Sequence, residues 1–387
     1  MKIAGIICEY NPLHLGHRKQ LQLLRAQLGA DCGIVCLMSG NYVQRGAPAV
    51  LDKSCRAEAA VRSGADLVLE LPVTYALSSA EGFAAGGVKI LSQLCDYLSF
   101  GAESGSAESL LETAKLLLSP EFPEQLHRQL EKGASFPVAR QAALEAMGAD
   151  SSALLQPNDI LAVEYCKAIL AQNTKMIPLP HLRQGCYHDT AIDPENPSAT
   201  ALRQAMADGG DWLCYVPEEA RSVLENASMH TLAAGEKAIL ARLRTMTDAE
   251  FEALPFGSEG LWRKLMHASR RESTLAQILA ATKSKRYTHT RLQRMILCAF
   301  LGITEELMSA PVPYVRVLAF NHRGREILNQ VKESGFFRNA GEPMPGPWEE
   351  LEQRCDSLYG LFADTPESPD AAAKRRVRYL REDPHAI

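Results

Sequence analysis

The sequence predicts an α/β protein, with a parallel β-sheet and crossover helices in the first half and a mainly helical C-terminal region. In the first half, short apolar runs rich in β-branched residues alternate with longer helical patterns, which is typical of parallel strands joined by helices. After residue 207 the strand signals fade and helical patterns dominate. The length of 387 residues favours two domains, because one domain typically takes about 150 residues.

The patterns of the first half can be placed along the chain. We expect strands at residues 3–8, 33–38, 66–71 and 97–100, with a further short strand at 176–179. We expect helices at residues 17–28, 53–63, 80–94 and 107–117, and a helical stretch from 120 to 172. Parallel sheets bind their ligands at the carboxyl ends of the strands. The loops at 8–16, 39–48 and 101–105 are therefore the predicted binding edge.

The second half is predicted to be a separate domain, so that the chain divides into residues 1–207 and 208–387. Helical patterns cover residues 218–243, 248–253, 258–281 and 290–301, and a strand-like run follows at 314–320. Between Gly260 and Ala299 there are nine lysines and arginines but only one acidic residue, Glu272. In a chain with a net charge of −5, this stretch predicts a local face for an anionic partner such as a nucleic acid.

Composition excludes several classes of protein. No apolar run reaches the ~18 residues of a membrane span, and a strand pattern starts directly after Met1-Lys2, so we expect no membrane association and no signal peptide. The ten cysteines form no C-x-x-C pair. This favours reduced, mostly buried thiols in a cytoplasmic protein over disulfides or zinc. No clustered carboxylates predict a metal site of the protein's own.

The most informative motif follows the first predicted strand: Asn11-Pro12 marks a turn, and His14-Leu15-Gly16-His17 begins the next helix. Residues three apart on a helix share a face, so His14 and His17 are expected to lie side by side. The N–H groups and dipole of a helix N-terminus favour an anion, and Gly16 allows close approach of a ligand. The motif predicts a phosphate site in which both imidazoles stabilise a departing pyrophosphate. Two ordinary surface histidines are the alternative.

A second motif, Ser198-Ala199-Thr200-Ala201-Leu202-Arg203, has the composition of another helix start. Its hydroxyls suit a helix cap, and Arg203 has the geometry to hold a phosphate through two N–H groups. Taken alone, a plain helix cap is the simpler interpretation. Combined with His14 and His17, the motif predicts that phosphates are held from two sides.

These two motifs resemble the HxGH and ISxTxxR pair of the nucleotidylyltransferase superfamily, whose members are Rossmann-like enzymes that transfer a nucleotide and release pyrophosphate. Ser198, Thr200 and Arg203 match the second motif in type and spacing, whereas Pro197 stands where an apolar residue such as isoleucine is common. The resemblance implies that the first domain is a Rossmann-like, ATP-binding catalytic domain, with His14, His17 and Arg203 as catalytic residues.

Further strings narrow the resemblance. They are, in order, Glu9-Tyr10-Asn11-Pro12-Leu13-His14, Met38-Ser39-Gly40-Asn41-Tyr42-Val43-Gln44-Arg45-Gly46, Phe100-Gly101-Ala102-Glu103-Ser104, Pro157-Asn158-Asp159-Ile160-Leu161, Arg183-Gln184-Gly185-Cys186-Tyr187-His188-Asp189, Lys283-Ser284-Lys285-Arg286-Tyr287-Thr288 and Tyr314-Val315-Arg316-Val317-Leu318-Ala319-Phe320. Over nearly the whole chain this is similar to the bacterial tRNA(Met) cytidine acetate ligase family. The resemblance implies that ATP and acetate give acetyl-adenylate and pyrophosphate. The acetyl group then passes to N4 of the wobble cytidine of elongator tRNA(Met), forming N4-acetylcytidine.

The resemblance also implies which residues bind ATP, with Mg²⁺ carried on the ATP phosphates. These residues are Ile7, Cys8, Glu9, Tyr10, Asn11, Pro12, Leu13, His14, Leu15, Gly16, His17, Gln20, Gly101, Asn158, Arg183, Ser198 and Thr200. A helix cap is the alternative for Asn158, and a surface ion pair is the alternative for Arg183.

Two groups of polar residues are candidates for the other substrates. After the second predicted strand, a cluster of polar residues is expected on the ligand side, and some of its members, Asn41, Gln44 and Arg45 above all, are expected to shape the acetate or cytidine pocket. The other members are Asp52, Lys53 and Arg56. For tRNA phosphates the candidates are Lys283, Lys285, Arg286, Arg291 and Arg294. Tyr287 beside them is suited to stack on a base. A solvated helix face is the alternative for any one of these residues.

Two other functions stay open at this point. One is a nucleotidylyltransferase that makes a small-molecule cofactor, and the other is a non-catalytic RNA-binding protein on the same scaffold. The basic helical region argues against the first, and the presence of His14, His17 and Arg203 argues against the second. The sequence predicts neither the oligomeric state, nor the residue that deprotonates the cytidine amine, nor the basis for choosing one tRNA.

Overall fold

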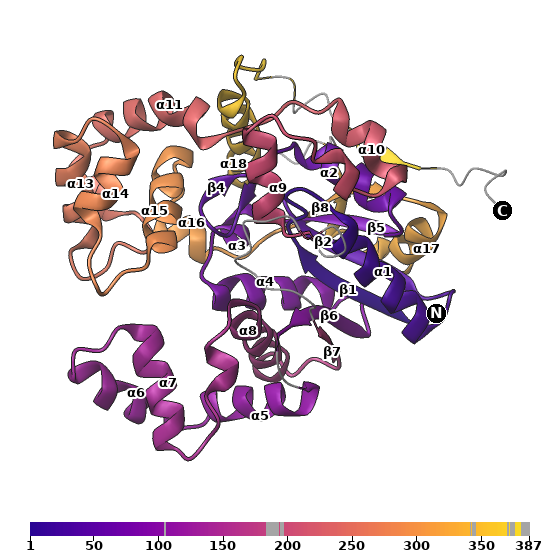
Figure 1. Ribbon diagram of the computed structural model, residues 1–387, viewed down its shortest axis with the longest axis horizontal. Coiled ribbons are helices and arrows are strands. Elements are labelled where there is room, and N and C mark those ends of the chain that lie inside the picture. The colour runs from indigo at the N-terminus through magenta and orange to yellow at the C-terminus, as the bar shows by residue number, and fades with distance from the viewer. Residues whose placement is uncertain are drawn as a thin grey trace.

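A computed structural model describes residues 1–103, 106–182, 193, 197–340, 342, 346–369, 371 and 376–380. At its centre is an eight-stranded sheet in the order β10-β8-β5-β2-β1-β6-β7, with β9 paired to β8 (Figure 1). Its strands are β1 (Ile3–Cys8), β2 (Gly33–Ser39), β5 (Leu67–Leu71), β6 (Tyr97–Ala102), β7 (Ile177–Leu182), β8 (Val315–Phe320), β9 (Phe337–Asn339) and β10 (Arg378–Tyr379). A small hairpin is formed by β3 (Tyr42–Val43) and β4 (Ala47–Pro48).

Most neighbouring strands of the sheet are parallel, as the sequence predicts. β1 lies between β2 and β6 and is parallel to both. β2 is parallel to β5, and β6 is parallel to β7, which confirms the short strand predicted near residue 176. β8 is the exception, because it runs antiparallel to β5. The carboxyl ends of β1, β2 and β6 therefore meet at one edge, where the binding loops were expected.

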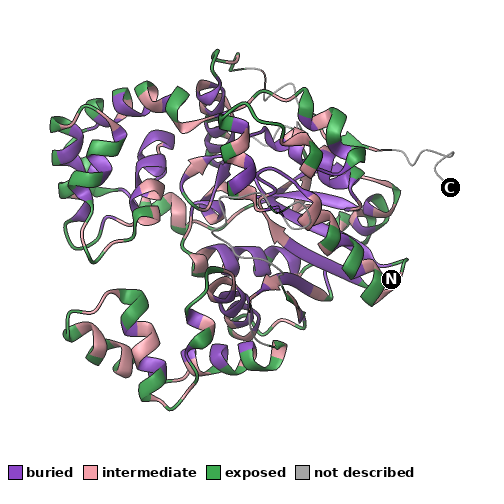
Figure 2. Ribbon diagram, viewed as in Figure 1, coloured by how far each residue is buried: buried purple, intermediate pink, exposed green. Residues whose placement is uncertain are grey.

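Helices cover both faces of this sheet, and its central strands β2 and β5 are buried along their whole length (Figure 2). Alternate residues of β2 point to opposite cores: Val35 and Leu37 join one core, while Ile34 and Cys36 join the other. Apolar side chains on both faces are what a parallel sheet under two helix layers requires. The helices of the first half are α1 (Leu15–Leu28), α2 (Lys53–Arg62), α3 (Val73–Ala76), α4 (Ala80–Leu91), α5 (Ala107–Leu117), α6 (Phe122–Glu131), α7 (Phe136–Ala146), α8 (Pro157–Ala171) and α9 (Ala199–Ala207).

Most helices of the second half pack around a third core, which includes Phe251, Leu265 and Leu297, whereas Leu224 and Ile327 belong to the two cores of the sheet. The helices are α10 (Glu218–Glu225), α11 (Leu232–Thr245), α12 (Asp248–Glu252), α13 (Leu261–Arg271), α14 (Leu275–Thr282), α15 (His289–Leu301), α16 (Glu305–Ser309), α17 (His322–Gln330) and α18 (Pro347–Tyr359). The single helix predicted at residues 258–281 is two helices, because Thr274 starts a new one with its own capping box. Within the described residues, no helix is long and apolar enough to cross a membrane.

The second half also contributes strands to the central sheet. β8 pairs with β5, and β9 and β10 pair with β8, so the two halves of the chain share one sheet. The described part of the second half is therefore mainly helical but not wholly so. The division into domains at residue 207 stays a prediction.

Candidate active site

His14 and His17 cap the N-terminus of α1, directly after β1 and the Asn11-Pro12 turn. The backbone N–H of Gly16 donates to Nδ1 of His14 at 3.1 Å, and the backbone N–H of His14 donates to Nδ1 of His17 at 3.3 Å. The two imidazole rings stack with centroids 3.7 Å apart. The structure thus brings the two histidines together at the helix start, as their spacing predicts.

These hydrogen bonds fix the tautomer of both rings. A backbone N–H only donates, so Nδ1 of His14 and Nδ1 of His17 are acceptors. In a neutral imidazole the proton then lies on Nε2. Each ring is therefore an N–H donor at Nε2. A pair of such donors beside a helix N-terminus suits the oxygens of a phosphate.

The second predicted motif forms the start of α9. Ser198 accepts the backbone N–H of Ala201 at 3.1 Å, so it is the helix cap that the sequence suggests. Arg203 donates to the carbonyl oxygen of Asn11 at 2.7 Å and to Oγ1 of Thr200 at 3.1 Å. The guanidinium of Arg203 thereby ties α9 to the turn that precedes His14.

The starts of α1 and α9 lie against each other at Gly16. A Cβ atom at this position would lie 3.0 Å from Cε1 of His14 and 4.0 Å from the carbonyl oxygen of Pro197. A larger residue would press on the His14 ring, so glycine is needed for this approach. Two helix N-termini, two imidazoles and one guanidinium thus converge. The two motifs that supply them lie far apart in the sequence, since Asn11 and Arg203 are separated by 192 residues.

Glu9 lies beside this convergence and is surrounded by arginines. Its Oε1 accepts the backbone N–H of Gln44 at 2.7 Å, and its own carbonyl oxygen accepts Nη1 of Arg56 at 2.6 Å. Burial raises the pKa of the Glu9 carboxyl above its usual 4.5, while the Gln44 N–H and the charges of Arg203, Arg56 and Arg45 oppose that rise. The arginines give this edge of the sheet a positive character that suits anionic substrates.

The remaining predicted ATP contacts near the turn divide by burial. Tyr10 and Leu13 are fully buried members of a sheet core, so their side chains support the turn from beneath. Asn11 and Pro12 are also buried, whereas Ile7, Cys8 and Leu15 are half-buried. Nε2 of Gln20 donates to Oγ of Ser99 in β6 at 3.0 Å, which links α1 to the next strand of the predicted binding edge.

Asn158 lies at the same edge but is not the cap of α8. The residue at the cap position is Gln156, whose side chain makes no capping bond. Nδ2 of Asn158 instead donates to Oε1 of Glu103 at 2.8 Å, in the loop that follows β6. Gly101 lies near the end of β6, close to this loop in sequence. Arg183 lies outside the described residues, so its predicted role stays a prediction.

Asn41, from the loop after β2, is buried and bonded on both sides of its amide. Its Oδ1 accepts the backbone N–H of Lys53 at 3.0 Å, and its Nδ2 donates to Oδ1 of Asp356 at 3.2 Å. Nζ of Lys53 lies 2.6 Å from Oδ1 of Asp356 and 2.9 Å from Oε1 of Glu70. Asn41 therefore fastens this loop to α2 and α18, and it is only 2% exposed.

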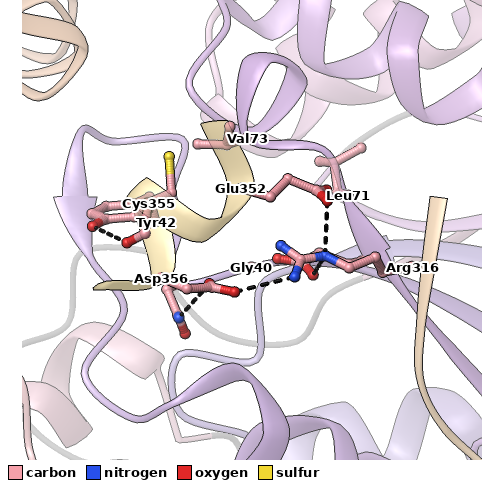
Figure 3. Close-up of a pocket in the computed structure, with 10 residues that line it drawn as sticks. Gly40, Tyr42, Leu71, Val73, Arg316, Glu352, Cys355 and Asp356 are labelled. Atoms are coloured by element: carbon pink, nitrogen blue, oxygen red, sulfur yellow. Dashed lines mark hydrogen bonds and ion pairs between the residues drawn. The ribbon is translucent and has the colours of Figure 1, made fainter. Parts of the chain in front are cut away.

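Arg316 of β8 completes the set of charges beneath the loop (Figure 3). Its Nε lies 3.1 Å from Oε2 of Glu70 and 3.2 Å from Oε2 of Glu352, and its Nη1 lies 3.2 Å from Oδ2 of Asp356. A cavity of about 10 Å³, room for roughly one water, lies among these side chains. We refer to Lys53, Glu70, Arg316, Glu352 and Asp356 as the buried charge cluster.

Two cations face three carboxyl groups in the buried charge cluster. Burial and the neighbouring charges shift the pKa values of Arg316, Asp356 and Glu352. Burial opposes the charge on Arg316, but the carboxylates of Glu70, Asp356 and Glu352 raise the pKa of its guanidinium. Burial would raise the pKa of Asp356, but Lys53 and Arg316 hold it below its usual value. Burial raises the pKa of Glu352 to about 7, which Arg316 only partly opposes.

Sequence reasoning did not find Glu70, Arg316, Glu352 or Asp356. A signal for two of them was present: Glu70 stands in the apolar run Leu67–Leu71 and Arg316 in Val315–Phe320, and both runs are buried strands. A charged residue inside a buried strand needs a partner. No feature of the sequence indicates that the partners come from α18.

The hairpin formed by β3 and β4 carries Gln44 and Arg45 and packs against α15. A Cβ atom on Gly46, which has a φ of +79°, would lie 2.4 Å from the backbone nitrogen of Arg294. Nη1 of Arg294 donates to the carbonyl oxygen of Gln44 at 3.3 Å. Burial lowers the pKa of Arg294 to about 10. Of these residues, Arg45 is exposed.

The predicted tRNA contacts therefore fall into two groups. Lys283, Lys285 and Arg286 are exposed. Arg291, like Arg294, turns inward: its Nη2 donates to the carbonyl oxygen of Phe256 at 2.7 Å. The three exposed residues face solvent, with Nη1 of Arg286 lying 3.0 Å from Oε2 of Glu259, whereas Arg291 and Arg294 hold α15 to its neighbours.

Comparisons with known proteins agree with this geometry. The sequence matches the family described as HIGH Nucleotidyl Transferase over residues 1–364. It is similar to the tRNA(Met) cytidine acetate ligase of Clostridium novyi (strain NT), with 36% identity over 352 residues, 86% of this chain and 88% of that protein. The protein of the same name from Clostridium perfringens (strain SM101 / Type A) is 35% identical over 387 residues, covering 94% of this chain and 96% of that one.

The fold is also similar to that of two solved structures. The structure is similar to the apo crystal structure of Thermotoga maritima TmcAL, with a TM-score of 0.89 and 30% identity over 99% of this chain and 100% of that one. A second crystal structure of Thermotoga maritima TmcAL, bound with alpha-thio ATP, has a TM-score of 0.87 and 29% identity over the same shares of both chains.

Proposed function

This chain belongs to the HIGH nucleotidyl transferase family and, within it, to the tRNA(Met) cytidine acetate ligases, and from that premise we propose a two-step reaction. In the first step ATP and acetate form acetyl-adenylate and pyrophosphate. In the second step the acetyl group passes to N4 of the wobble cytidine of elongator tRNA(Met). The observation that carries the proposal is the convergence of His14, His17 and Arg203 at two helix starts.

In the first step a carboxylate oxygen of acetate attacks the α-phosphorus of ATP, and the bond to the β-phosphate oxygen breaks. Pyrophosphate leaves with the electron pair of that bond. The Nε2–H groups of His14 and His17 and the N-termini of α1 and α9 donate to the phosphate oxygens on which charge increases. Preorganised donors of this kind stabilise the transition state because they need no reorganisation.

No covalent intermediate with the protein is needed, because acetyl-adenylate is already an activated acyl donor. Cys8 ends β1, directly before Glu9, and burial raises the pKa of its thiol well above the usual value. A thiol in that state carries little thiolate and is a poor nucleophile. Holding the adenylate and the cytidine amine in contact is then the main task of the protein in the second step.

Mg²⁺ is proposed to arrive on the ATP phosphates and to neutralise part of their charge. Within the described residues, no group of three or more His, Cys, Asp or Glu side chains is arranged to hold a metal ion. The protein's own contribution to phosphate binding is the set of N–H donors and arginines described above.

The exposed residues Lys283, Lys285 and Arg286, between α14 and α15, are the proposed contacts for tRNA phosphates. The double variant Lys285→Ala/Arg286→Ala is expected to weaken tRNA(Met) binding. It should also flatten the plot of log affinity against log salt by about one to two units. Lys115→Ala/Lys132→Ala is the matched control, because Lys115 in α5 and Lys132 directly after α6 are both exposed. An unchanged affinity and slope would mean that tRNA(Met) binds at another surface of the protein.

Acetate-dependent exchange between ATP and pyrophosphate, measured with and without tRNA(Met), tests the proposal. Exchange with acetate, followed by appearance of N4-acetylcytidine in tRNA(Met), is the expected result. Exchange that requires a different small acceptor instead of acetate would indicate an enzyme of cofactor synthesis. Bound tRNA with no exchange under any condition would indicate a non-catalytic binding protein.

A further inference from the structure

Acetyl transfer to a cytidine amine needs a proton acceptor, and this requirement rests on the function proposed above. The N4 lone pair is delocalised into the pyrimidine ring, so the amine is a weak nucleophile. Attack on the acetyl carbon becomes productive only when one N4 proton is removed. A side chain that acts as general base in such a step typically contributes about 10²- to 10⁴-fold to the rate.

Most titratable side chains around the Asn11-Pro12 turn are unsuited to this role. Nδ1 of His14 and Nδ1 of His17 already accept backbone N–H groups, so the lone pair that would take a proton is engaged. Burial raises the pKa of Tyr10 and of Cys8 well above the usual values, so both are protonated at neutral pH. Among the described side chains of this turn, the Glu9 carboxylate is the acceptor that fits.

We propose that Glu9 is the general base of the second step. The residue is anchored at two points, because its Oε1 accepts the Gln44 N–H at 2.7 Å and its carbonyl oxygen accepts Nη1 of Arg56 at 2.6 Å. Glu9 follows the last residue of β1 and is half-buried, not enclosed. It lies between the His14 and His17 cap and the hairpin that carries Gln44.

The charges around Glu9 suit a base that works near neutral pH. Arg45 from the hairpin, Arg56 from α2 and Arg203 from α9 face it, and so does the phenol of Tyr165 from α8. Burial raises the Glu9 pKa and the arginines limit the rise. The carboxylate is thereby made more basic than a free glutamate, yet it is kept ionised for the reaction.

In the proposed step, N4 of the cytidine attacks the acetyl carbon while a Glu9 oxygen takes one N4 proton. The bond between the acetyl carbon and the phosphate oxygen then breaks, and AMP leaves with its electron pair. The products are N4-acetylcytidine, AMP and protonated Glu9, which returns its proton to solvent. No oxidant, reductant or further reactant is required.

The substitution Glu9→Gln tests the proposal cleanly, because the amide oxygen still accepts the Gln44 N–H while the basic carboxylate is lost. Because Glu9 belongs to the predicted ATP segment, its acetate-dependent ATP–pyrophosphate exchange is measured as the reference for any loss of ATP binding. Acetylation of tRNA(Met) in a single turnover should fall by about 10²- to 10⁴-fold more than exchange does. Glu9→Asp, which keeps a carboxylate on a shorter arm, should recover part of this loss.

Two further measurements separate a base from a structural residue. Hydroxylamine needs no general base, so Glu9→Gln should lose no more in acetohydroxamate formation than it loses in ATP–pyrophosphate exchange. The native transfer rate should rise with pH as Glu9 ionises, and Glu9→Gln should lack that rise. Equal losses in exchange and transfer, or an unchanged transfer rate, would overturn the proposal. A native protein with no exchange would instead refute the proposed function itself.

Discussion

Two sides of the candidate site are built in different ways. The phosphate side, residues 9–17 with 198–203, is organised mainly by hydrogen bonds within one helix turn, such as those from Gly16 to His14 and from His14 to His17. The hairpin side, residues 39–53, is held from far along the chain: Asn41 and Asp356 are 315 residues apart, and Lys53 and Asp356 are 303 apart. The two histidines are positioned locally, with Arg203 as the one long-range contact described above, whereas the position of the hairpin side depends on several contacts far along the chain.

This difference has an energetic consequence. Buried charges are expensive to remove from water, and they are tolerated only when partners surround them. The hairpin side rests on such charges through Lys53, whose partners in the buried charge cluster include Glu70, and both Glu70 and Arg316 have at least two charged contacts. The phosphate side has mostly neutral donors and caps. Damage to the hairpin side should therefore cost stability, and damage to the phosphate side should cost activity.

The largest effect is expected from Lys53→Met. This change leaves Glu70 and Asp356 buried without one of their cations, since Lys53 contacts both. Removing one member of a buried ion pair typically costs about 3–5 kcal/mol of unfolding free energy. Urea denaturation measures the loss, and ATP binding by the folded fraction should be unchanged because the phosphate side does not use Lys53.

Arg128→Met is the matched control for Lys53→Met. Arg128 forms an exposed ion pair with Glu124 on α6, and such pairs contribute only about 0.2–1 kcal/mol. Equal losses of unfolding free energy in both variants would mean that the buried charge cluster contributes no more to stability than an exposed ion pair does. Loss of ATP binding by folded Lys53→Met would mean that the two sides form a single unit.

The second prediction is a loss of activity with little loss of stability. His14→Asn keeps a side chain that caps helices well but removes the Nε2–H donor. We expect the rate of acetate-dependent ATP–pyrophosphate exchange to fall by about 10²- to 10³-fold. The free energy of unfolding should change by less than about 1 kcal/mol. The control is His127→Asn, at an exposed position on α6, which should alter neither the exchange rate nor the free energy of unfolding. A large loss of stability in His14→Asn would contradict the prediction that the phosphate side matters for activity and not for stability.

The same contrast explains what the sequence could and could not predict. The spacing of His14 and His17, the Ser198 cap and the parallel strands follow from local patterns, and the structure confirms those features. The pairing of Lys53 with Asp356 depends on how α18 packs near the sheet, which no local pattern encodes. The inward turn of Arg294 was missed for a similar reason: its partner, the carbonyl oxygen of Gln44, is 250 residues away.

The third prediction tests how tightly the hairpin is docked. Gly46 and Gly133 have similar positive φ angles, +79° and +81°, but only Gly46 has neighbours: its Cβ would lie 2.4 Å from the Arg294 nitrogen, and Gly133 has nothing within 4 Å. Alanine at either position costs about 1–2 kcal/mol in backbone strain. Gly46→Ala should cost about 1–3 kcal/mol more, because overpacking forces the hairpin off α15. Equal losses would show that the hairpin is loosely docked.

The smallest effect is expected from Glu352→Gln, and its sign depends on pH. Burial raises the pKa of Glu352 from 4.5 to about 7 in the folded protein. Between these values the folded chain therefore holds a proton that the unfolded chain has lost. Stability from this group is fully present below pH 4.5 and is lost as the pH rises through about 7. Glutamine does not ionise, so the variant escapes that loss.

Because Glu352 shares its cation with Glu70 and Asp356, we expect Glu352→Gln to exceed the native protein by about 1–2 kcal/mol at pH 8 and to match it near pH 5. Urea denaturation at both pH values measures the difference, with the exposed Glu350→Gln on the same helix as control. A variant less stable than the native protein at pH 8 would mean that Arg316 stabilises the ionised Glu352 carboxylate by more than burial destabilises it. The hairpin side would then depend on three charged carboxylates, and its stability would increase with pH instead of falling.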